Sequence, residues 1–173
     1  PRIAILGAGP IGLEAGLFAK SLNLPFTIFE RGKVGENVQR WGHVKLFSPF
    51  GMNVTPLGRA AIQASKLNAT FPADDAYITG REFLAAYLQP IADTLQGKIS
   101  TETQVLRLGR QDYFKMDGPG DSRRSVSPFR LLVRDKTKDR IEEADVILDC
   151  TGVYGQHRWA GAGGIPAPGE LQA

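Results

Sequence analysis

Apolar residues along this chain follow two patterns, which together predict an alternation of strands and helices. Short continuous apolar runs at 2–6, 26–29 and 145–149 are typical of buried strands. Between the first two runs, residues 13–22 are rich in Ala, Gly and Leu, which predicts a helix packed closely on the sheet. Strands that alternate with helices predict an α/β domain built on a parallel sheet.

A second helix is predicted over 80–95, because apolar residues recur there every three or four positions. Thr79 and Glu82 have the spacing of a capping box, which places the start of this helix at Gly80. Pro90 lies inside the pattern, and its missing N–H group should kink the helix.

After this helix the pattern changes to short strands joined by polar turns. A short strand is expected at 98–100, and the segments 103–108, 129–135 and 140–144 also have strand character. These last three predict a three-stranded antiparallel meander inserted into the otherwise parallel sheet. A loop rich in Gly, Pro, Ser and Arg is expected at 117–127.

Residues 35–72 show no regular period and are rich in Gly, Pro and aromatic residues. A long irregular stretch inside a compact domain is usually functional or disordered. Trp41, Phe47 and Phe50 argue against disorder, because disordered segments are poor in aromatic residues. We therefore expect this segment to wrap around a ligand or a neighbouring domain.

The first strand runs directly into a glycine-rich turn, Gly7-Ala8-Gly9-Pro10-Ile11-Gly12, with the spacing G-x-G-x-x-G. In such a turn Gly7 permits the tight bend, Gly9 lets a pyrophosphate approach the backbone, and Gly12 lets the helix pack on the strand. Free N–H groups and the positive dipole end at the start of the following helix also favour phosphate. Pro10 and Ile11 are therefore candidate binding residues together with the three glycines.

Glu30 directly follows the second strand. An acid in this position accepts hydrogen bonds from ribose hydroxyl groups, and its charge repels a 2′-phosphate. Strand, turn, helix, strand and acid thus fall in the order that a dinucleotide-binding site requires. The sequence predicts such a site here and disfavours NADP as its occupant.

The last strand leads into Cys150-Thr151-Gly152. With the glycine turn and the meander, this segment resembles the FAD domain of flavoproteins that carry two dinucleotide-binding domains. That superfamily includes glutathione-reductase-like enzymes and flavin-containing monooxygenases, and Cys150 stands where its A-T-G motif has Ala. The resemblance implies a three-layer Rossmann-like FAD/NAD(P)-binding domain, non-covalent FAD, and NADPH or NADH as co-substrate.

The resemblance also implies further cofactor-binding residues. Arg31 would lie near the adenine, with a solvated side chain as the alternative, and Val105 would meet the adenine through its backbone. Thr151 and Gly152 would approach the pyrophosphate or the ribitol.

Two more candidates come from the irregular segment, where Gln39-Arg40-Trp41-Gly42 resembles the G-G-x-W element of monooxygenase-like members. Trp41 and His43 would line the flavin pocket, with a core aromatic residue and a surface histidine as the alternatives.

Cysteine usage separates the branches of this superfamily. Disulfide reductases of the glutathione-reductase type carry a C-x-x-x-x-C pair soon after the acidic residue, whereas residues 32–50 contain no Cys and the chain has only 1. A dithiol relay within these residues is excluded, while enzymes that carry the pair in the other domain stay open. His157 is not the histidine of the monooxygenase motif F-x-G-x-x-x-H, which we do not find in the chain.

The sequence thus predicts the FAD-binding part of an NAD(P)H-dependent flavoprotein oxidoreductase, monooxygenase-like, that acts on a small-molecule substrate. A non-oxygenating reductase or oxidase and a non-catalytic dinucleotide-binding module stay open as alternatives.

No catalytic acid–base pair is recognisable in the sequence. Cys150, His43 and His157 do not make a metal-ligand constellation. The expected organisation is an FAD-binding domain at 1–155 and a linker at 156–173 toward an NAD(P)H-binding domain of a longer protein.

Composition narrows the expected partners. With 42% hydrophobic and 23% charged residues, the chain has the balance of an ordinary globular domain. Its net charge of +3 is not gathered on a basic helix, so we expect no nucleic-acid binding. No apolar run has the length of a membrane span. A single cysteine suits a reducing compartment, so we expect a cytoplasmic protein, with a homodimer as one assembly that the sequence allows.

Overall fold

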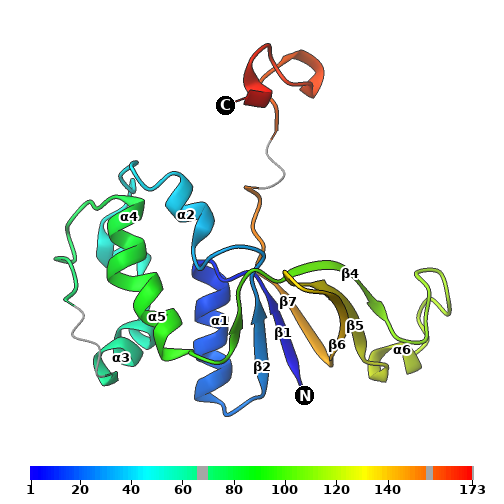
Figure 1. Cartoon of the computed structure of the whole chain (residues 1–173). Helices are drawn as coiled ribbons and strands as arrows, with labels where there is room; N and C mark the ends of the chain where they lie inside the picture. The colour runs from blue at the N-terminus through cyan, green and yellow to red at the C-terminus, as the bar shows by residue number, and fades with distance from the viewer. Residues whose placement is uncertain (66–69, 155–157, 173) are drawn as a thin grey trace.

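The computed structural model describes residues 1–65, 70–154 and 158–172. Helices form one layer, a parallel sheet forms the middle layer, and an antiparallel sheet lies on the other side (Figure 1). The predicted fold class, an α/β Rossmann-like domain with a three-stranded antiparallel meander, is confirmed. The C-terminal residues 158–172, drawn in red, stand apart from these layers in Figure 1.

The parallel sheet has four strands in the order β3-β2-β1-β7. Their bounds are β1 (Ile3–Leu6), β2 (Phe26–Phe29), β3 (Ile99–Ser100) and β7 (Val146–Asp149). In the central strand, Leu6 pairs with Phe29 on one side and with Asp149 on the other. Strands β1, β2 and β7 therefore end together, and the chain segments that follow these three strands meet at one edge of the sheet.

Side chains of the central strand alternate between the two outer layers, as a strand requires. Ile5 is fully buried in the core beneath the helices, which also contains Ile28. Ala4 and Leu6 point to the other side and pack with Leu131 of the antiparallel sheet. One short strand thus holds both outer layers together.

Helix α1 (Pro10–Ser21) starts earlier than the apolar pattern alone predicts. Proline is favourable in the first helical turn, because its φ is already helical and its N–H group would be unpaired there. Gly16 faces the sheet: a Cβ atom at this position would lie 2.8 Å from Cδ1 of Ile28 and 3.1 Å from Cδ1 of Leu95. The helix therefore lies closer to the sheet than a larger residue would allow.

The irregular segment 35–72 contains more helix than we expected. The elements are α2 (Glu36–Arg40), the 3₁₀ turn η1 (Phe50–Asn53) and α3 (Pro56–Ala64). The first of these was missed because a five-residue helix shows too little periodicity to be recognised.

The second predicted helix is confirmed in three parts. These are α4 (Gly80–Phe83), the π-helical turn η2 (Leu84–Leu88) and α5 (Gln89–Thr94). Thr79 and Glu82 form the predicted capping box. The π-helical turn directly precedes Pro90, which has no N–H group for the carbonyl of Ala86 and therefore interrupts the regular helical bonding.

The meander forms a sheet of its own in the order β4-β5-β6. Its strands are β4 (Gln104–Arg110), β5 (Phe129–Arg134) and β6 (Asp139–Ala144), all antiparallel. The expected loop at 117–127 contains one short helix, α6 (Arg123–Val126).

Strand β7 corrects one expectation, because it is not a buried strand. It lies at the edge of the parallel sheet, and Val146 and Leu148 remain 37% and 36% exposed.

Beyond β7, the described residues contain two short 3₁₀ turns, η3 (Ala162–Gly164) and η4 (Glu170–Gln172). The expected domain boundary between 155 and 156, and His157, lie outside the described residues. Among the described helices, none has the length and apolar character needed to cross a membrane.

A buried polar network joins the helices behind the glycine turn. The hydroxyl of Tyr87 donates to Oε1 of Glu14 at 2.5 Å and accepts the backbone N–H of Thr55 at 2.9 Å. The hydroxyl of Thr55 donates to the other carboxylate oxygen of Glu14 at 2.8 Å. Burial, and the hydrogen bond donated to Glu14, raise the pKa of Tyr87 to about 12, so the donor is protonated at neutral pH.

We expect Tyr87→Phe to lower the free energy of unfolding by about 1–3 kcal/mol, because it leaves the buried N–H of Thr55 and the carboxylate of Glu14 each short of a partner. Urea denaturation monitored by circular dichroism measures this change. The matched control is Tyr77→Phe, at an exposed tyrosine, which should change stability by no more than about 0.5 kcal/mol. Equal stability of the two variants would contradict the proposed role of the network.

Candidate dinucleotide-binding site

The glycine turn between β1 and α1 is held in its shape by two very close contacts. Gly7 has a φ of +99°, and a Cβ atom there would lie 2.8 Å from the carbonyl oxygen of Cys150. A Cβ atom at Gly12 would lie 1.9 Å from the carbonyl oxygen of Gly7. Both positions therefore require glycine for reasons internal to the protein, as the motif predicts.

Gly9 differs from these two glycines. Its φ of −82° and ψ of −174° are accessible to any residue, and a Cβ atom there would meet nothing within 4 Å. The space in front of Gly9 belongs to a cleft, so no contact within the described protein explains the absence of a side chain. A ligand that lies against the backbone would explain it.

Glu30 connects the turn to the end of β2. Its Oε2 accepts the backbone N–H of Ala8, and its Oε1 accepts the N–H of Gly32, both at 2.8 Å. Each carboxylate oxygen keeps a second lone pair for another donor. The acid is thus fixed at the edge of the cleft in an orientation suited to ribose hydroxyl groups.

Two adjoining cavities run across this edge of the parallel sheet. The first, of about 250 Å³, lies over the glycine turn, and the second, of about 380 Å³, lies between the sheet and β4. They share Gly7, Glu30, Arg31, Asn37, Thr151 and Gly152. Together they form an elongated groove, which suits an extended molecule better than a compact one.

Trp41 supplies an unused hydrogen-bond donor in the wall of the first cavity. Its indole Nε1 is buried and has no hydrogen-bond partner within the described residues. The ring is held in place by Gly80, where a Cβ atom would lie 2.5 Å from Cζ3 of the indole. A buried N–H group without a partner is rare, and this one belongs to a residue that lines the cavity.

The segment that follows β7 forms the opposite wall. Asp149 accepts the hydroxyl of Thr151 at 2.6 Å and its backbone N–H at 3.1 Å, and both hydrogen bonds hold the pKa of Asp149 below its usual value. Gly152 has a φ of +69° and open space around it. The backbone at this wall is therefore both fixed and accessible.

All but two of the predicted site residues line the two cavities. The first contains Gly7, Gly9, Pro10, Ile11, Glu30, Arg31, Trp41, Thr151 and Gly152, and the second adds Val105. Gly12 supports the turn from below, and His43 is exposed and lines neither cavity.

Sequence reasoning missed Asn37 on α2 and Gln104 on β4, which also line the groove. The only sequence feature that pointed to Asn37 was the nearby Gly35. This glycine has a φ of +62° and is the N-cap of α2, the helix that carries Asn37 and that the sequence did not predict.

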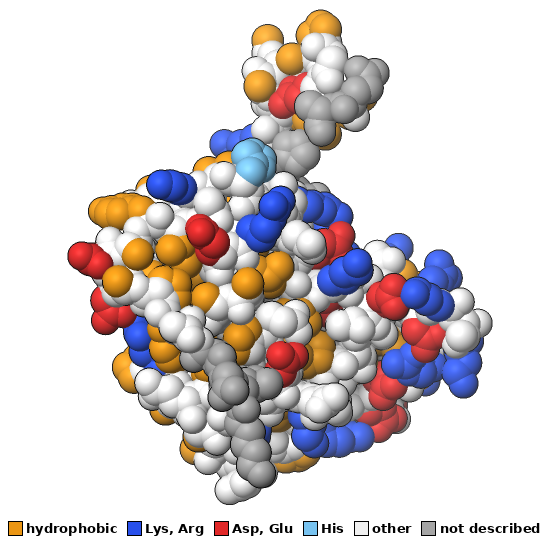
Figure 2. All heavy atoms as spheres, turned by 60° about the vertical axis from the view of Figure 1, so that its left-hand side comes forward, with side chains coloured by type: hydrophobic (Ala, Val, Ile, Leu, Met, Phe, Trp, Pro, Cys, Tyr) orange, Lys and Arg blue, Asp and Glu red, His pale blue; other side chains and the backbone are white. Residues whose placement is uncertain are grey.

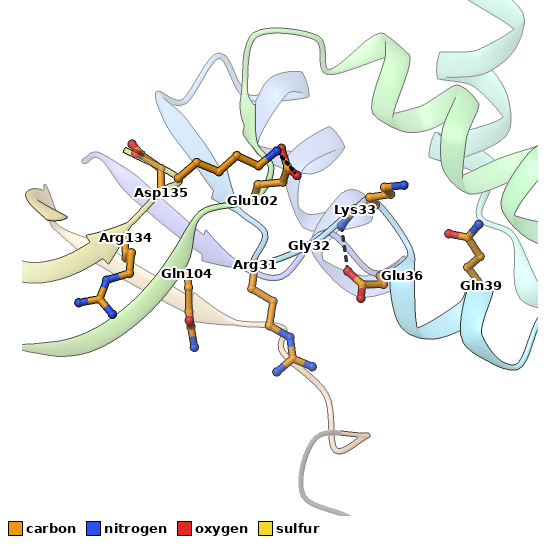
Figure 3. A pocket seen from close by; sticks show the side chains of 10 residues that line it. Arg31, Gly32, Lys33, Glu36, Gln39, Glu102, Gln104, Arg134 and Asp135 are labelled. Atoms are coloured by element: carbon orange, nitrogen blue, oxygen red, sulfur yellow. Dashed lines mark hydrogen bonds and ion pairs between the residues drawn. The ribbon is translucent and has the colours of Figure 1, made fainter. Parts of the chain in front are cut away.

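A larger hollow of about 580 Å³ adjoins the groove at Arg31 (Figure 3). Most of its charged side chains already have partners. For example, Lys136 binds Glu102 at 2.6 Å, and Glu36 accepts a hydrogen bond from the backbone N–H of Lys33 at 3.0 Å. Figure 3 shows the guanidinium of Arg31 turned away from these pairs. The hollow contains no part of the glycine turn, so we assign the dinucleotide site to the smaller groove.

No group of three or more His, Cys, Asp or Glu within the described residues could hold a metal ion. Cys150 lines the groove, and burial, with a smaller contribution from the charge of Asp149, raises the pKa of its thiol. A raised pKa keeps the thiol protonated at neutral pH, which argues against a nucleophilic role.

A sequence model described as pyridine nucleotide-disulphide oxidoreductase matches residues 4–117. The chain belongs to this family. The match covers the glycine turn, Glu30 and the start of the meander, whereas the wall of the groove that follows β7 lies beyond it. No curated protein sequence matches the chain significantly.

Solved structures show the same fold. Bacillithiol disulfide reductase from Bacillus cereus is 16% identical over 94% of this chain, with a TM-score of 0.67. Cyclohexanone monooxygenase is 15% identical over 92% of this chain, with a TM-score of 0.66. OTEMO in complex with FAD and NADP is 12% identical over 87% of this chain, with a TM-score of 0.60.

The chain spans 43%, 27% and 25% of the length of these three proteins, respectively. More than half of each protein therefore lies outside the similarity. One of the three is a disulfide reductase and another a monooxygenase. Proteins of this fold therefore include both a disulfide reductase and a monooxygenase.

We expect the Cys150 thiol to react slowly with iodoacetamide in the folded protein, with a midpoint pH above that of an ordinary thiol, because burial disfavours the thiolate. Mass spectrometry across a pH series measures the rate. The same protein in urea is the control and should titrate at the ordinary thiol pKa. A folded-state midpoint below the unfolded one would contradict the assignment and indicate an activated cysteine.

Proposed function

We propose that the groove binds FAD and that the chain is the FAD-binding part of an NAD(P)H-dependent flavoprotein oxidoreductase. The observation that carries the proposal is Gly9, where the protein leaves open space beside a backbone that any residue could adopt. The buried, unpartnered Nε1 of Trp41 supports it independently. Both features lie in one cavity and both are explained by an extended ligand on the turn.

Each wall of the groove has a distinct task in this proposal. The start of α1 faces the pyrophosphate with free N–H groups and the positive end of the helix dipole. Glu30 accepts hydrogen bonds from the ribose hydroxyl groups, and Arg31 and Val105 lie near the adenine. Thr151 and Gly152 cover the pyrophosphate or ribitol from the side of β7. When bound, FAD supplies hydride and electron transfer, and the protein contributes binding and orientation.

For the reaction itself, we propose a monooxygenase-like oxidoreductase with oxygen as the acceptor. The sequence supports this reading because residues 32–50 contain no Cys and the chain has only one, so these residues cannot carry a dithiol relay. The similarity to bacillithiol disulfide reductase supports the second candidate, a reductase that passes electrons to another acceptor.

FAD titration measured by flavin fluorescence tests the binding site. Gly9→Ser should weaken binding about tenfold or more, because the added side chain enters the space of the pyrophosphate, while serine remains a good helix N-cap. Glu30→Gln removes an acceptor of charge-assisted hydrogen bonds and should cost about tenfold. Trp41→Phe removes the N–H donor together with part of the ring and should cost at least about three- to tenfold.

His43→Ala is the matched control for this series, since His43 lies off the groove. Its FAD affinity should equal that of the unchanged protein, and urea denaturation should show all four variants to be folded. Unchanged affinity of Gly9→Ser and Glu30→Gln would refute the assignment of the groove.

The acceptor is tested by adding NADPH or NADH to the FAD-loaded longer protein that contains this chain together with the proposed NAD(P)H-binding domain, first without oxygen and then with it. We expect the flavin absorbance to bleach with reductant. With a small organic substrate present, one atom of ¹⁸O₂ should appear in the product, as mass spectrometry detects. Bleaching followed only by hydrogen peroxide, or only by reduction of a disulfide, would exclude the monooxygenase and leave an oxidase or reductase. A protein that binds FAD but never bleaches would indicate a non-catalytic module.

A further inference from the structure

The outer face of the antiparallel sheet carries a hollow that belongs to no part of the dinucleotide site. Strand register places Arg107, Leu132 and Ile141 in one row across β4, β5 and β6. Neighbouring residues on β5, Leu131 and Val133, are fully buried in the core between the two sheets. Because successive side chains of a strand point to opposite faces, the row of Arg107 faces away from the parallel sheet.

The hollow has a volume of about 350 Å³ and combines an apolar floor with basic walls. Ile141 is 47% exposed, and its register partner Leu132 lies beside it on the same face. Every charged residue in the lining is an arginine, namely Arg107, Arg110 and Arg130. No carboxylate contributes to the lining.

These arginines are not neutralised by carboxylates. Nη1 of Arg107 binds the backbone carbonyl of Leu106 at 2.7 Å. Arg110 lies opposite Phe129 in the register, so its side chain is on the inner face, where it binds the carbonyl of Ser127 and stacks 3.7 Å from the ring centroid of Phe129. Arg130 has no hydrogen-bond or ion-pair partner within the described residues.

Other arginines of the same sheet are paired. Arg134 binds both carboxylate oxygens of Asp139, at 2.6 and 2.8 Å. Glu143, which lies opposite Arg130 in the register, is bound by Arg2 at 3.2 Å instead. Figure 2 likewise shows basic and acidic side chains mixed over much of the face that it displays. The hollow is thus a local excess of positive charge over exposed aliphatic side chains.

We propose that this hollow binds an acidic polypeptide segment that carries aliphatic side chains. Carboxylates would pair with the guanidinium groups of Arg107 and Arg130, which bind them in a bidentate manner, and aliphatic side chains would cover Leu132 and Ile141. The hollow is too shallow and open to enclose a small molecule, which favours a polypeptide. It is also concave, whereas contact with a bilayer uses apolar side chains that protrude.

The test uses a short synthetic peptide of alternating Glu and Leu, with the corresponding Lys-Leu peptide for comparison. Amide NMR shifts of the folded protein report binding and its location. We expect the Glu-Leu peptide to shift residues around Arg107, Arg130 and Ile141, with an affinity that falls as salt rises. The double variant Arg107→Gln/Arg130→Gln should weaken binding about tenfold or more.

Arg134→Gln is the matched control, because Arg134 lies on the same sheet but is already paired with Asp139. It should bind the peptide as the unchanged protein does. The proposal is overturned if the Lys-Leu peptide binds equally well, if Arg134→Gln loses as much affinity as the double variant, or if no peptide binds. Binding to phosphatidylglycerol vesicles that depends on Arg107 and Arg130, without peptide binding, would overturn it in favour of a membrane surface.

Discussion

The structure depends on the close approach of three backbone segments at the end of β1. Gly7 turns there with a positive φ. A Cβ atom at Gly7 would lie 2.8 Å from the carbonyl oxygen of Cys150, and one at Gly12 would lie 1.9 Å from the carbonyl oxygen of Gly7. These contacts fix the end of β7 and the start of α1 against the same turn. Any side chain at either glycine would push one of the two walls of the groove away.

Glu30 extends this constraint to the second strand. Its carboxylate accepts hydrogen bonds from the backbone N–H groups of Ala8 and Gly32, and these bonds hold the end of β2 against the turn. The groove therefore needs no folding of a loop around a ligand: its turn, acid and opposite wall are all placed by strand ends of one sheet. Such preorganisation lowers the cost of ordering the protein on binding.

The sequence predicted the parts of this site that rest on local pattern. The strand, glycine turn, helix and acid have fixed spacing, so Gly7, Gly9 and Glu30 could be assigned without a structure, as could the meander. The edge position of β7 could not, because an apolar run has the same appearance in a central strand and in an edge strand. His43 and Asn37 show the same limit, since which side chains of an irregular segment reach the groove depends on α2, which the pattern does not reveal.

The family and the fold leave two kinds of electron acceptor open, and the groove itself explains why. In the proposed function, the groove contributes backbone groups, the carboxylate of Glu30 and Trp41 to cofactor binding, and none of these groups selects the electron acceptor. One fold can therefore serve disulfide reductases and monooxygenases alike, with the reaction decided by groups outside the turn.

The central claim is that the groove over the glycine turn, rather than the larger charged hollow beside Arg31, binds the dinucleotide. Amide NMR of the protein during titration with FAD tests it most directly. The account predicts that the largest shifts fall on the backbone N–H groups of Gly9, Ile11 and Gly152. Shifts confined to the residues around Lys33, Glu102 and Arg134, or the absence of any shift, would contradict it.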